Sequence, residues 1–194
     1  MAKPKLATTS LAGCFGCHMS ILDIDERILD LVEIVDFDKS PVDDIKKFTG
    51  QCAIGLIEGG CCNEGNVEVL LEFRKHCDIL VLVGECAIMG GLPAMRNNIP
   101  LKECFEEAYL KGPTVYNPSG KVPNDEDLPL ILDKVYPCKD IVKVDYYLPG
   151  CPPSADAIWA AVVAILNGKD ASLLPYELIK YDWWNIKESK QKHS

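Results

Sequence analysis

The sequence predicts an α/β protein built on a doubly wound parallel sheet, and three observations support this prediction. Apolar runs of strand length alternate with segments whose apolar residues recur at helical spacing, as in βαβ units. The run Asp78–Val83 is aliphatic at every position after the first, which is typical of a strand covered on both faces of a parallel sheet. Glycines follow several of the runs and mark where strands end.

The first half of the chain alternates between the two patterns. Ile21, Ile24 and Ile28 recur at helical spacing, and the run Cys52–Glu58 is apolar on both faces until Glu58. The predicted elements are a strand at 5–12, a helix at 18–30, a strand at 31–37, a strand at 52–58 and a helix at 64–76.

The second half continues with a strand at 78–83, a helical stretch at 101–110, a strand at 143–148 and a helix at 154–167. Residues 112–140 contain five prolines and read as a loop; a loop of this length in a compact domain is functional or serves for docking. We therefore expect one domain over 1–168. Residues 169–194, with Trp183 and Trp184, are expected to form an arm that packs on a partner.

Composition excludes some classes of function. The net charge of −9 argues against a nucleic-acid-binding protein, whose footprint is a basic patch. The N-terminus has no apolar signal core, and no apolar run approaches the roughly 20 residues needed to cross a bilayer. We expect a cytoplasmic protein without membrane insertion. In that compartment ten cysteines indicate metal binding or catalysis rather than disulfides.

Four cysteines follow predicted strands directly. They occur in Cys14-Phe15-Gly16-Cys17, in Gly84-Glu85-Cys86 and in Pro149-Gly150-Cys151-Pro152-Pro153. In a doubly wound sheet ligands lie beyond the carboxyl ends of the strands, so all four thiols are expected at one edge. Four thiolates can hold an iron–sulfur cluster, and the pattern therefore predicts a protein that carries electrons.

Other interpretations of these cysteines exist. Cys14 and Cys17 alone would fit a redox dithiol or a zinc site, and with His18 they match a haem-attachment pattern. Haem attachment requires an exported protein, and a dithiol leaves Cys86 and Cys151 unexplained. Structural zinc sites come as paired short knuckles, which the two single, distant cysteines do not form.

Some residues near the proposed site have two interpretations. Glu58 ends an apolar strand and could be a solvated carboxylate or a proton-transit group beside a redox centre; Glu85 and His18 present the same choice. The solvated interpretation is the simpler one for all three. Cys61 and Cys62 follow Glu58-Gly59-Gly60 at the same edge, and we expect them near the cluster without ligating it.

The order of the motifs resembles the small subunit of nickel–iron hydrogenases. The resemblance covers about residues 5–168 and rests on Cys14-Phe-Gly-Cys17, Ile57-Glu-Gly59, Gly84-Glu-Cys86-Ala-Ile-Met-Gly-Gly91 and Leu148-Pro-Gly-Cys151-Pro-Pro153. It implies a flavodoxin-like fold in which Cys14, Cys17, Cys86 and Cys151 hold one 4Fe–4S cluster beside the nickel–iron centre of a large subunit. The chain alone would not be catalytic. Cys61 and Cys62 depart from the family pattern.

A short subunit with one cluster and no leader resembles that of cytoplasmic, bidirectional, NAD-reducing hydrogenases. This resemblance implies further partners, which are iron–sulfur and flavin subunits that reduce NAD. The superfamily also contains the proximal-cluster subunit of respiratory complex I, an alternative with a quinone reductase function, but its first motif is a tandem cysteine pair. Bound FMN is disfavoured here, because the loop that would hold its phosphate carries Cys14 and Cys17.

Overall fold

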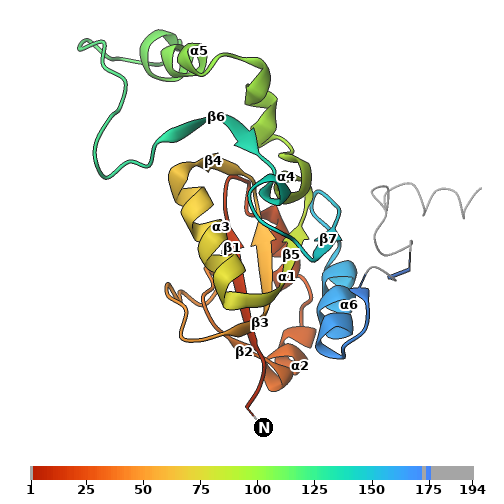
Figure 1. Cartoon of the computed structure of the whole chain (residues 1–194). Coiled ribbons are helices and arrows are strands. Elements are labelled where there is room, and N and C mark those ends of the chain that lie inside the picture. The colour runs from red at the N-terminus through yellow and green to blue at the C-terminus, as the bar shows by residue number, and fades with distance from the viewer. Residues whose placement is uncertain (1, 172–173, 176–194) are drawn as a thin grey trace, which may run out of the picture.

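The computed structural model describes residues 2–171, 174 and 175, and these form a five-stranded sheet with helices on both faces (Figure 1). The strands lie in the order β2-β1-β3-β5-β7, and all neighbours are parallel. This order is that of flavodoxin-like folds, so the predicted fold class is confirmed. The strands are β1 (Lys5–Ser10), β2 (Asp36–Phe37), β3 (Cys52–Glu58), β5 (Cys77–Val83) and β7 (Tyr146–Leu148).

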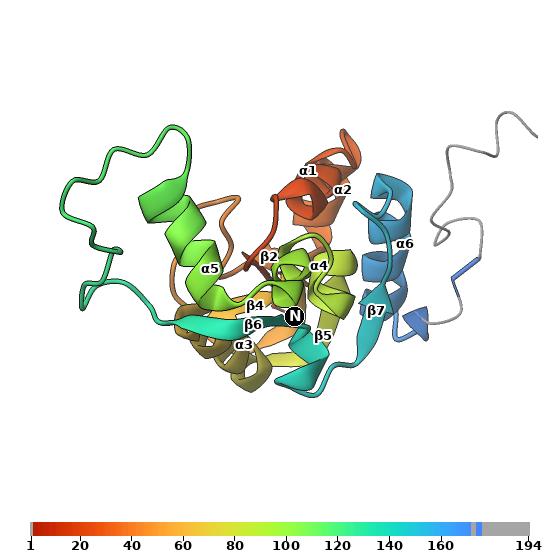
Figure 2. The ribbon, with the colours of Figure 1, turned by 90° about the horizontal axis from the view of Figure 1, so that it is seen from above.

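The helices cover the two faces unequally, as Figure 2 shows from above. Helices α1 (Gly16–Leu22), α2 (Arg27–Ile34) and α6 (Ala155–Leu166) pack on one face, and α3 (Glu64–His76) covers the other. Alternate residues of each strand serve the two cores: Val81 packs with α6, whereas Leu80 packs with Phe73 of α3. Burial on both faces is why the central strands are nearly continuous aliphatic runs.

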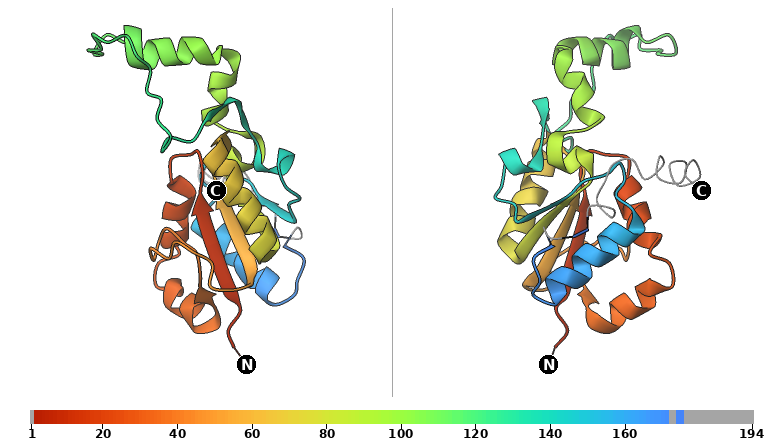
Figure 3. Two further views of the ribbon diagram at one scale, coloured as in Figure 1. Left: turned by 60° about the vertical axis from the view of Figure 1, so that its left-hand side comes forward. Right: turned by 90° about the vertical axis from the view of Figure 1, so that its right-hand side faces the viewer.

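A smaller layer stands at the carboxyl ends of the strands. Strands β4 (Cys61–Asn63) and β6 (Ile131–Tyr136) pair antiparallel there. The short α4 (Glu85–Met89) leads through a 3₁₀ turn (Pro93–Asn98) to α5 (Leu101–Glu106) and a π-helical turn (Glu107–Lys111). A second 3₁₀ turn, Cys138–Asp140, follows β6. Figure 3 shows α5 and the loop after it projecting from the sheet.

Three predicted elements need correction. The helix expected at 18–30 is two helices, broken by a turn in which Asp25 has φ 60°. The strand expected at 31–37 is wrong, since α2 continues to Ile34 and only Asp36–Phe37 pair with β1. The segment 112–140 is not loop throughout, because it contains β6. Most of the arm expected at 169–194 lies outside the described residues. Among the helices that the structure describes, none is long and apolar enough to span a membrane.

A buried carboxylate attaches the segment after β2 to the sheet. Asp38 is 1% exposed, pairs with Lys5 Nζ at 2.9 Å, and accepts hydrogen bonds from the backbone N–H groups of Thr49 and Lys39. Burial alone would raise the pKa of Asp38, but the hydrogen bonds from Thr49 and Lys5 outweigh burial and lower the pKa to about 2.

This pKa gives Asp38 a pH-dependent contribution to stability. The carboxylate binds protons less readily in the folded state, so its contribution is complete above about pH 4 and is lost as the pH falls toward 2. We expect Asp38→Asn to lower the free energy of unfolding by about 2 kcal/mol at pH 7, and by much less at pH 2.5. Urea unfolding at both pH values checks this, with the exposed Asp43→Asn as control. Equal losses at the two pH values would contradict it.

Candidate metal centre

The structure brings the four predicted cysteines to one edge of the sheet. Cys14 lies in the loop after β1, Cys17 in the first turn of α1, Cys86 in α4 after β5, and Cys151 after β7. Burial, then Glu58, and then the other three thiols raise the pKa of Cys17. Burial also raises the pKa of Cys86, with smaller contributions from Cys151 and Cys14. Cys17 and Cys86 therefore lie close enough to the other cysteines of the group for charge on those thiols to affect them. Cys14 and Cys151 are exposed and Cys17 is buried.

Glycines lie directly against the sulfurs of Cys17 and Cys86. A Cβ atom on Gly84 would lie 2.4 Å from the Cys17 sulfur and 3.3 Å from the Gly150 carbonyl oxygen, and one on Gly91 would lie 2.9 Å from the Cys86 sulfur. Side chains at these positions would fill the space around the thiols. Glycine leaves that space open and lets the backbone approach a bound group closely, so the residues present fit a compact thiolate-bound cofactor.

The spacing of the donors bears on which metal could bind. Within residues 2–171, 174 and 175, no three cysteine, histidine or acidic side chains are arranged to hold one metal ion. A zinc ion needs its sulfurs about 2.3 Å from a single centre. A four-iron cluster is bound through one thiolate per iron, which spreads the sulfurs apart. Four thiolate donors are the usual ligands of an iron–sulfur cluster, and the choice of a cluster over a single zinc ion stays a prediction.

The solvated interpretation of Glu58 and His18 is wrong, since they are 3% and 1% exposed. The Glu58 carboxylate accepts hydrogen bonds from the His18 backbone N–H at 3.0 Å and the Cys17 backbone N–H at 3.4 Å, and it contacts the His18 ring at Nδ1. Through these contacts Glu58 holds the first turn of α1, and with it Cys17, against the end of β3. A role for Glu58 in proton transit stays a prediction.

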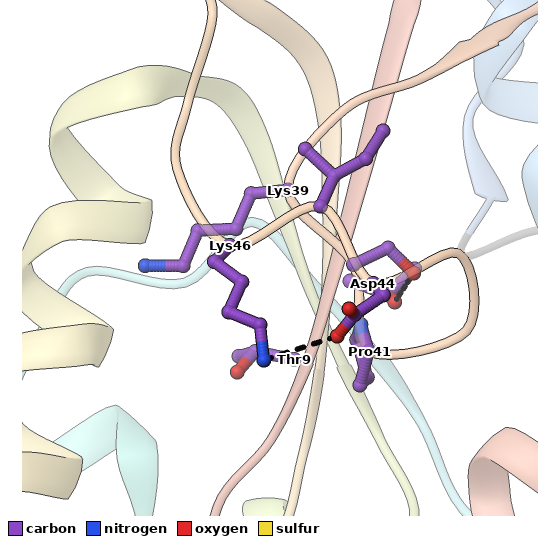
Figure 4. A pocket seen from close by; sticks show the side chains of 8 residues that line it. Thr9, Lys39, Pro41, Asp44 and Lys46 are labelled. Carbon is purple, nitrogen blue, oxygen red and sulfur yellow. Dashed lines mark hydrogen bonds and ion pairs between the residues drawn. The ribbon is translucent and has the colours of Figure 1, made fainter.

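The hydrogen bonds continue from His18 toward the surface. His18 Nε2 lies 3.0 Å from Thr8 Oγ1, which lies 2.9 Å from Ser40 Oγ. Thr8 and Ser40 line a pocket of about 300 Å³ in which Lys46 pairs with Asp44 at 3.1 Å (Figure 4). Sequence reasoning missed Thr8 and Ser40. The run of hydroxyl residues Thr8-Thr9-Ser10 at the end of β1 was the available signal for Thr8.

Glu85 is also buried, at 8% exposure, so its solvated interpretation is wrong as well. One carboxylate oxygen accepts a hydrogen bond from the Gly150 backbone N–H at 2.8 Å. The other oxygen is buried and has no partner among the described residues. Glu85 thus connects the start of α4, which carries Cys86, to the loop of Cys151.

The remaining cysteines have partners of their own. Cys61 is fully buried, and the neighbouring Cys138 lowers its pKa. The Cys138 thiol donates to the Gly59 carbonyl oxygen at 3.2 Å. The Cys62 thiol donates to Asn66 Oδ1 at 3.3 Å. The contact of Cys138 with Cys61 was not predicted, and nothing in the sequence spacing indicates it. The structure places Cys61 and Cys62 at the same end of the sheet as the four-cysteine group, as expected.

A doubly wound sheet with four cysteines gathered beyond its strand ends defines the class that contains hydrogenase small subunits and related respiratory subunits. The family model of the 20 kDa subunit of NADH ubiquinone oxidoreductase matches residues 14–165. The chain belongs to this family.

Similar proteins narrow the position of the chain within the family. It is 48% identical over 182 residues to the delta subunit of the NAD-reducing hydrogenase HoxS of Cupriavidus necator, covering 93% of the chain and 86% of the relative. It is 39% identical to one of the subunits of the F420-non-reducing hydrogenase of Methanothermobacter thermautotrophicus, covering 88% of the chain and 56% of that relative.

Solved structures agree with these relatives. A chain in the crystal structure of an NAD⁺-reducing [NiFe]-hydrogenase in the H₂-reduced state superposes with a TM-score of 0.88 at 50% identity, covering 93% of this chain and 99% of that one. A [NiFeSe]-hydrogenase of Dm. baculatum shares the fold alone, with a TM-score of 0.54 at 16% identity. The resemblance to small subunits of NAD-reducing hydrogenases is confirmed.

Proposed function

We propose that this chain is the iron–sulfur electron-transfer subunit of an NAD-reducing nickel–iron hydrogenase, an oxidoreductase. The observation that carries this proposal is the gathering of four thiols at one sheet edge in a chain 48% identical to a subunit of such an enzyme. Cys14, Cys17, Cys86 and Cys151 would hold one 4Fe–4S cluster, a group that accepts and releases single electrons. The chain alone would not split hydrogen.

The protein's own contribution is to hold and surround the cluster. Glycines leave the sulfurs of Cys17 and Cys86 against bare backbone, where N–H groups can hydrogen-bond to cluster sulfur and so tune the potential. Exposure of Cys14 and Cys151 leaves one side of the site for a partner to cover.

Exposed apolar side chains beside the site indicate where the nickel–iron large subunit would bind. Met89, Leu92 and Met95 follow Cys86 closely and are 57%, 68% and 65% exposed. Methionine and aromatic side chains are enriched in interfaces. Iron–sulfur and flavin subunits that reduce NAD complete the proposed complex. Its location would be the cytoplasm, because none of the ten cysteines forms a disulfide.

Metal analysis and EPR of the anaerobically purified complex test the proposal. We expect about four irons and four sulfides assignable to this chain and a fast-relaxing signal on reduction, together with nickel in a co-purifying large subunit. Zinc in place of iron, or an iron-free chain, would remove the proposal.

The second candidate is a subunit of a complex I-like quinone reductase, which the name of the matching family favours. Co-purification separates the two functions: quinone-binding partners without nickel would support this candidate. The pair Cys14 and Cys17, separated by two residues, stands against it, because the first motif of the complex I subunit is a tandem cysteine pair.

The C-terminal arm, residues 169–194, is proposed to contact a partner subunit, on the strength of its aromatic residues. We expect a chain truncated after residue 170 to co-purify with less of the large subunit at equal expression. Quantitative gel densitometry of the affinity-purified complex measures this. Full recovery of an active complex would contradict the proposal.

A further inference from the structure

Two hydrogen bonds of opposite direction join the first residue of α4, which precedes Cys86, to the loop of Cys151. The Glu85 backbone N–H donates to the Gly150 carbonyl oxygen at 3.1 Å. The Gly150 backbone N–H donates to the Glu85 carboxylate at 2.8 Å. Glu85 immediately precedes Cys86, and Gly150 immediately precedes Cys151. The two hydrogen bonds therefore hold the backbone next to both proposed ligands at a fixed separation.

The sheet itself ends just before this point. Strand β7 has three residues and pairs with β5 only from Val81–Tyr146 to Val83–Leu148, after which one further bond runs from the Gly84 N–H to the Leu148 carbonyl oxygen. Beyond Leu148 the ladder offers the Cys151 loop no further support. The contact between Glu85 and Gly150 extends the attachment toward the cysteine.

Burial makes Glu85 an unusual choice for such a contact. The residue is 8% exposed and one carboxylate oxygen is buried without a partner among the described residues. Buried polar atoms are rarely left unpaired, and a buried charge is costly. The hydrogen bond from the Gly150 N–H explains why a long side chain that ends in an acceptor oxygen, that of Glu85, is buried at this position.

We propose that Glu85 is a positioning residue that holds the Cys151 loop at its spacing from Cys86, which rests on the proposed cluster-binding function. The property that matters is the acceptor oxygen at the reach of a glutamate side chain. Negative charge is not what holds the loop. Glutamine supplies the same oxygen at the same reach without charge, whereas aspartate keeps the charge and is one methylene shorter.

The experiment compares wild type with Glu85→Gln, Glu85→Asp and Glu85→Ala, each purified anaerobically in the full complex. Release of ferrous iron to bathophenanthroline, compared with the wild-type complex, gives the additional iron loss that each substitution causes. EPR of the reduced complex shows whether the signal assigned to this chain is the one that changes. We expect wild-type rate and signature for the glutamine variant. The aspartate and alanine variants should lose iron about tenfold faster, as the loss of one hydrogen bond implies, with shifted EPR signals.

Several outcomes would overturn the inference. Slow release by the aspartate variant with fast release by the glutamine variant would assign the effect to charge, and equal rates for all four complexes would leave no positioning role. If the alanine variant does not fold, the comparison of glutamine with aspartate still decides. Wild-type complex without iron would overturn the cluster-binding function and this inference together, whereas the variant results overturn the inference alone.

Discussion

Replacing Cys86 by serine should remove the proposed cluster from an otherwise folded chain. Serine keeps the size of the side chain but does not supply the thiolate that iron–sulfur clusters require. We expect iron assigned to this chain to fall from about four atoms to below one, with loss of the EPR signal and of electron transfer to NAD. Iron analysis and EPR of the purified complex measure both.

Cys62→Ser provides a matched control, because it makes the same chemical change at a half-buried thiol that donates to Asn66. It should keep the full iron content. The opposite pattern would show that the ligands are wrongly assigned: Cys62→Ser would abolish the EPR signal, and Cys86→Ser would leave it intact.

Gly84→Ala should disrupt the site through backbone and side chain together. Gly84 has φ 83° and ψ 165°, a region that essentially only glycine occupies. The added Cβ would also lie 2.4 Å from the Cys17 sulfur. Strain and overpacking together should lower the free energy of unfolding by about 2–5 kcal/mol and displace Cys17, so that the complex is purified with little iron.

Gly120→Ala separates the two causes. Gly120 also has positive φ, 62°, but a Cβ there would have no atom within 4 Å, so only backbone strain of about 1–2 kcal/mol is expected, with normal iron content. Thermal unfolding and iron analysis of both variants measure the difference. Equal effects of the two substitutions would show that contact with Cys17 is unimportant.

The sequence was most informative where one signal dominated. Continuous aliphatic runs predicted β3 and β5 correctly, because a strand buried on both faces needs apolar residues at every position. β2 was misjudged because Ile28, Leu31 and Val35 keep helical spacing and α2 runs on almost to the strand. β4 has three residues, two of them cysteine, too few to show any period.

Among the residues of the candidate site, the cysteines could be predicted from the sequence and the buried polar side chains could not. The placement of four cysteines could be predicted, since each follows a strand and parallel strands end at a common edge. The burial of His18 and Glu58 could not, because it depends on contacts such as that between Glu58 and His18, 40 residues apart. Polar side chains buried through distant partners leave no local pattern in a sequence.

Cys14 and Cys151 lie far apart in the sequence but at one edge of the sheet. This separation sets the order in which the four thiols become available during synthesis and folding. Synthesis delivers Cys14 and Cys17 first, and they must remain reduced thiols until nearly four-fifths of the polypeptide has been made. Only when β7 has aligned beside β5 do all four donors face the same space. Insertion of the proposed cluster would therefore follow the pairing of β7 with β5, and the iron would enter a sheet that is already assembled.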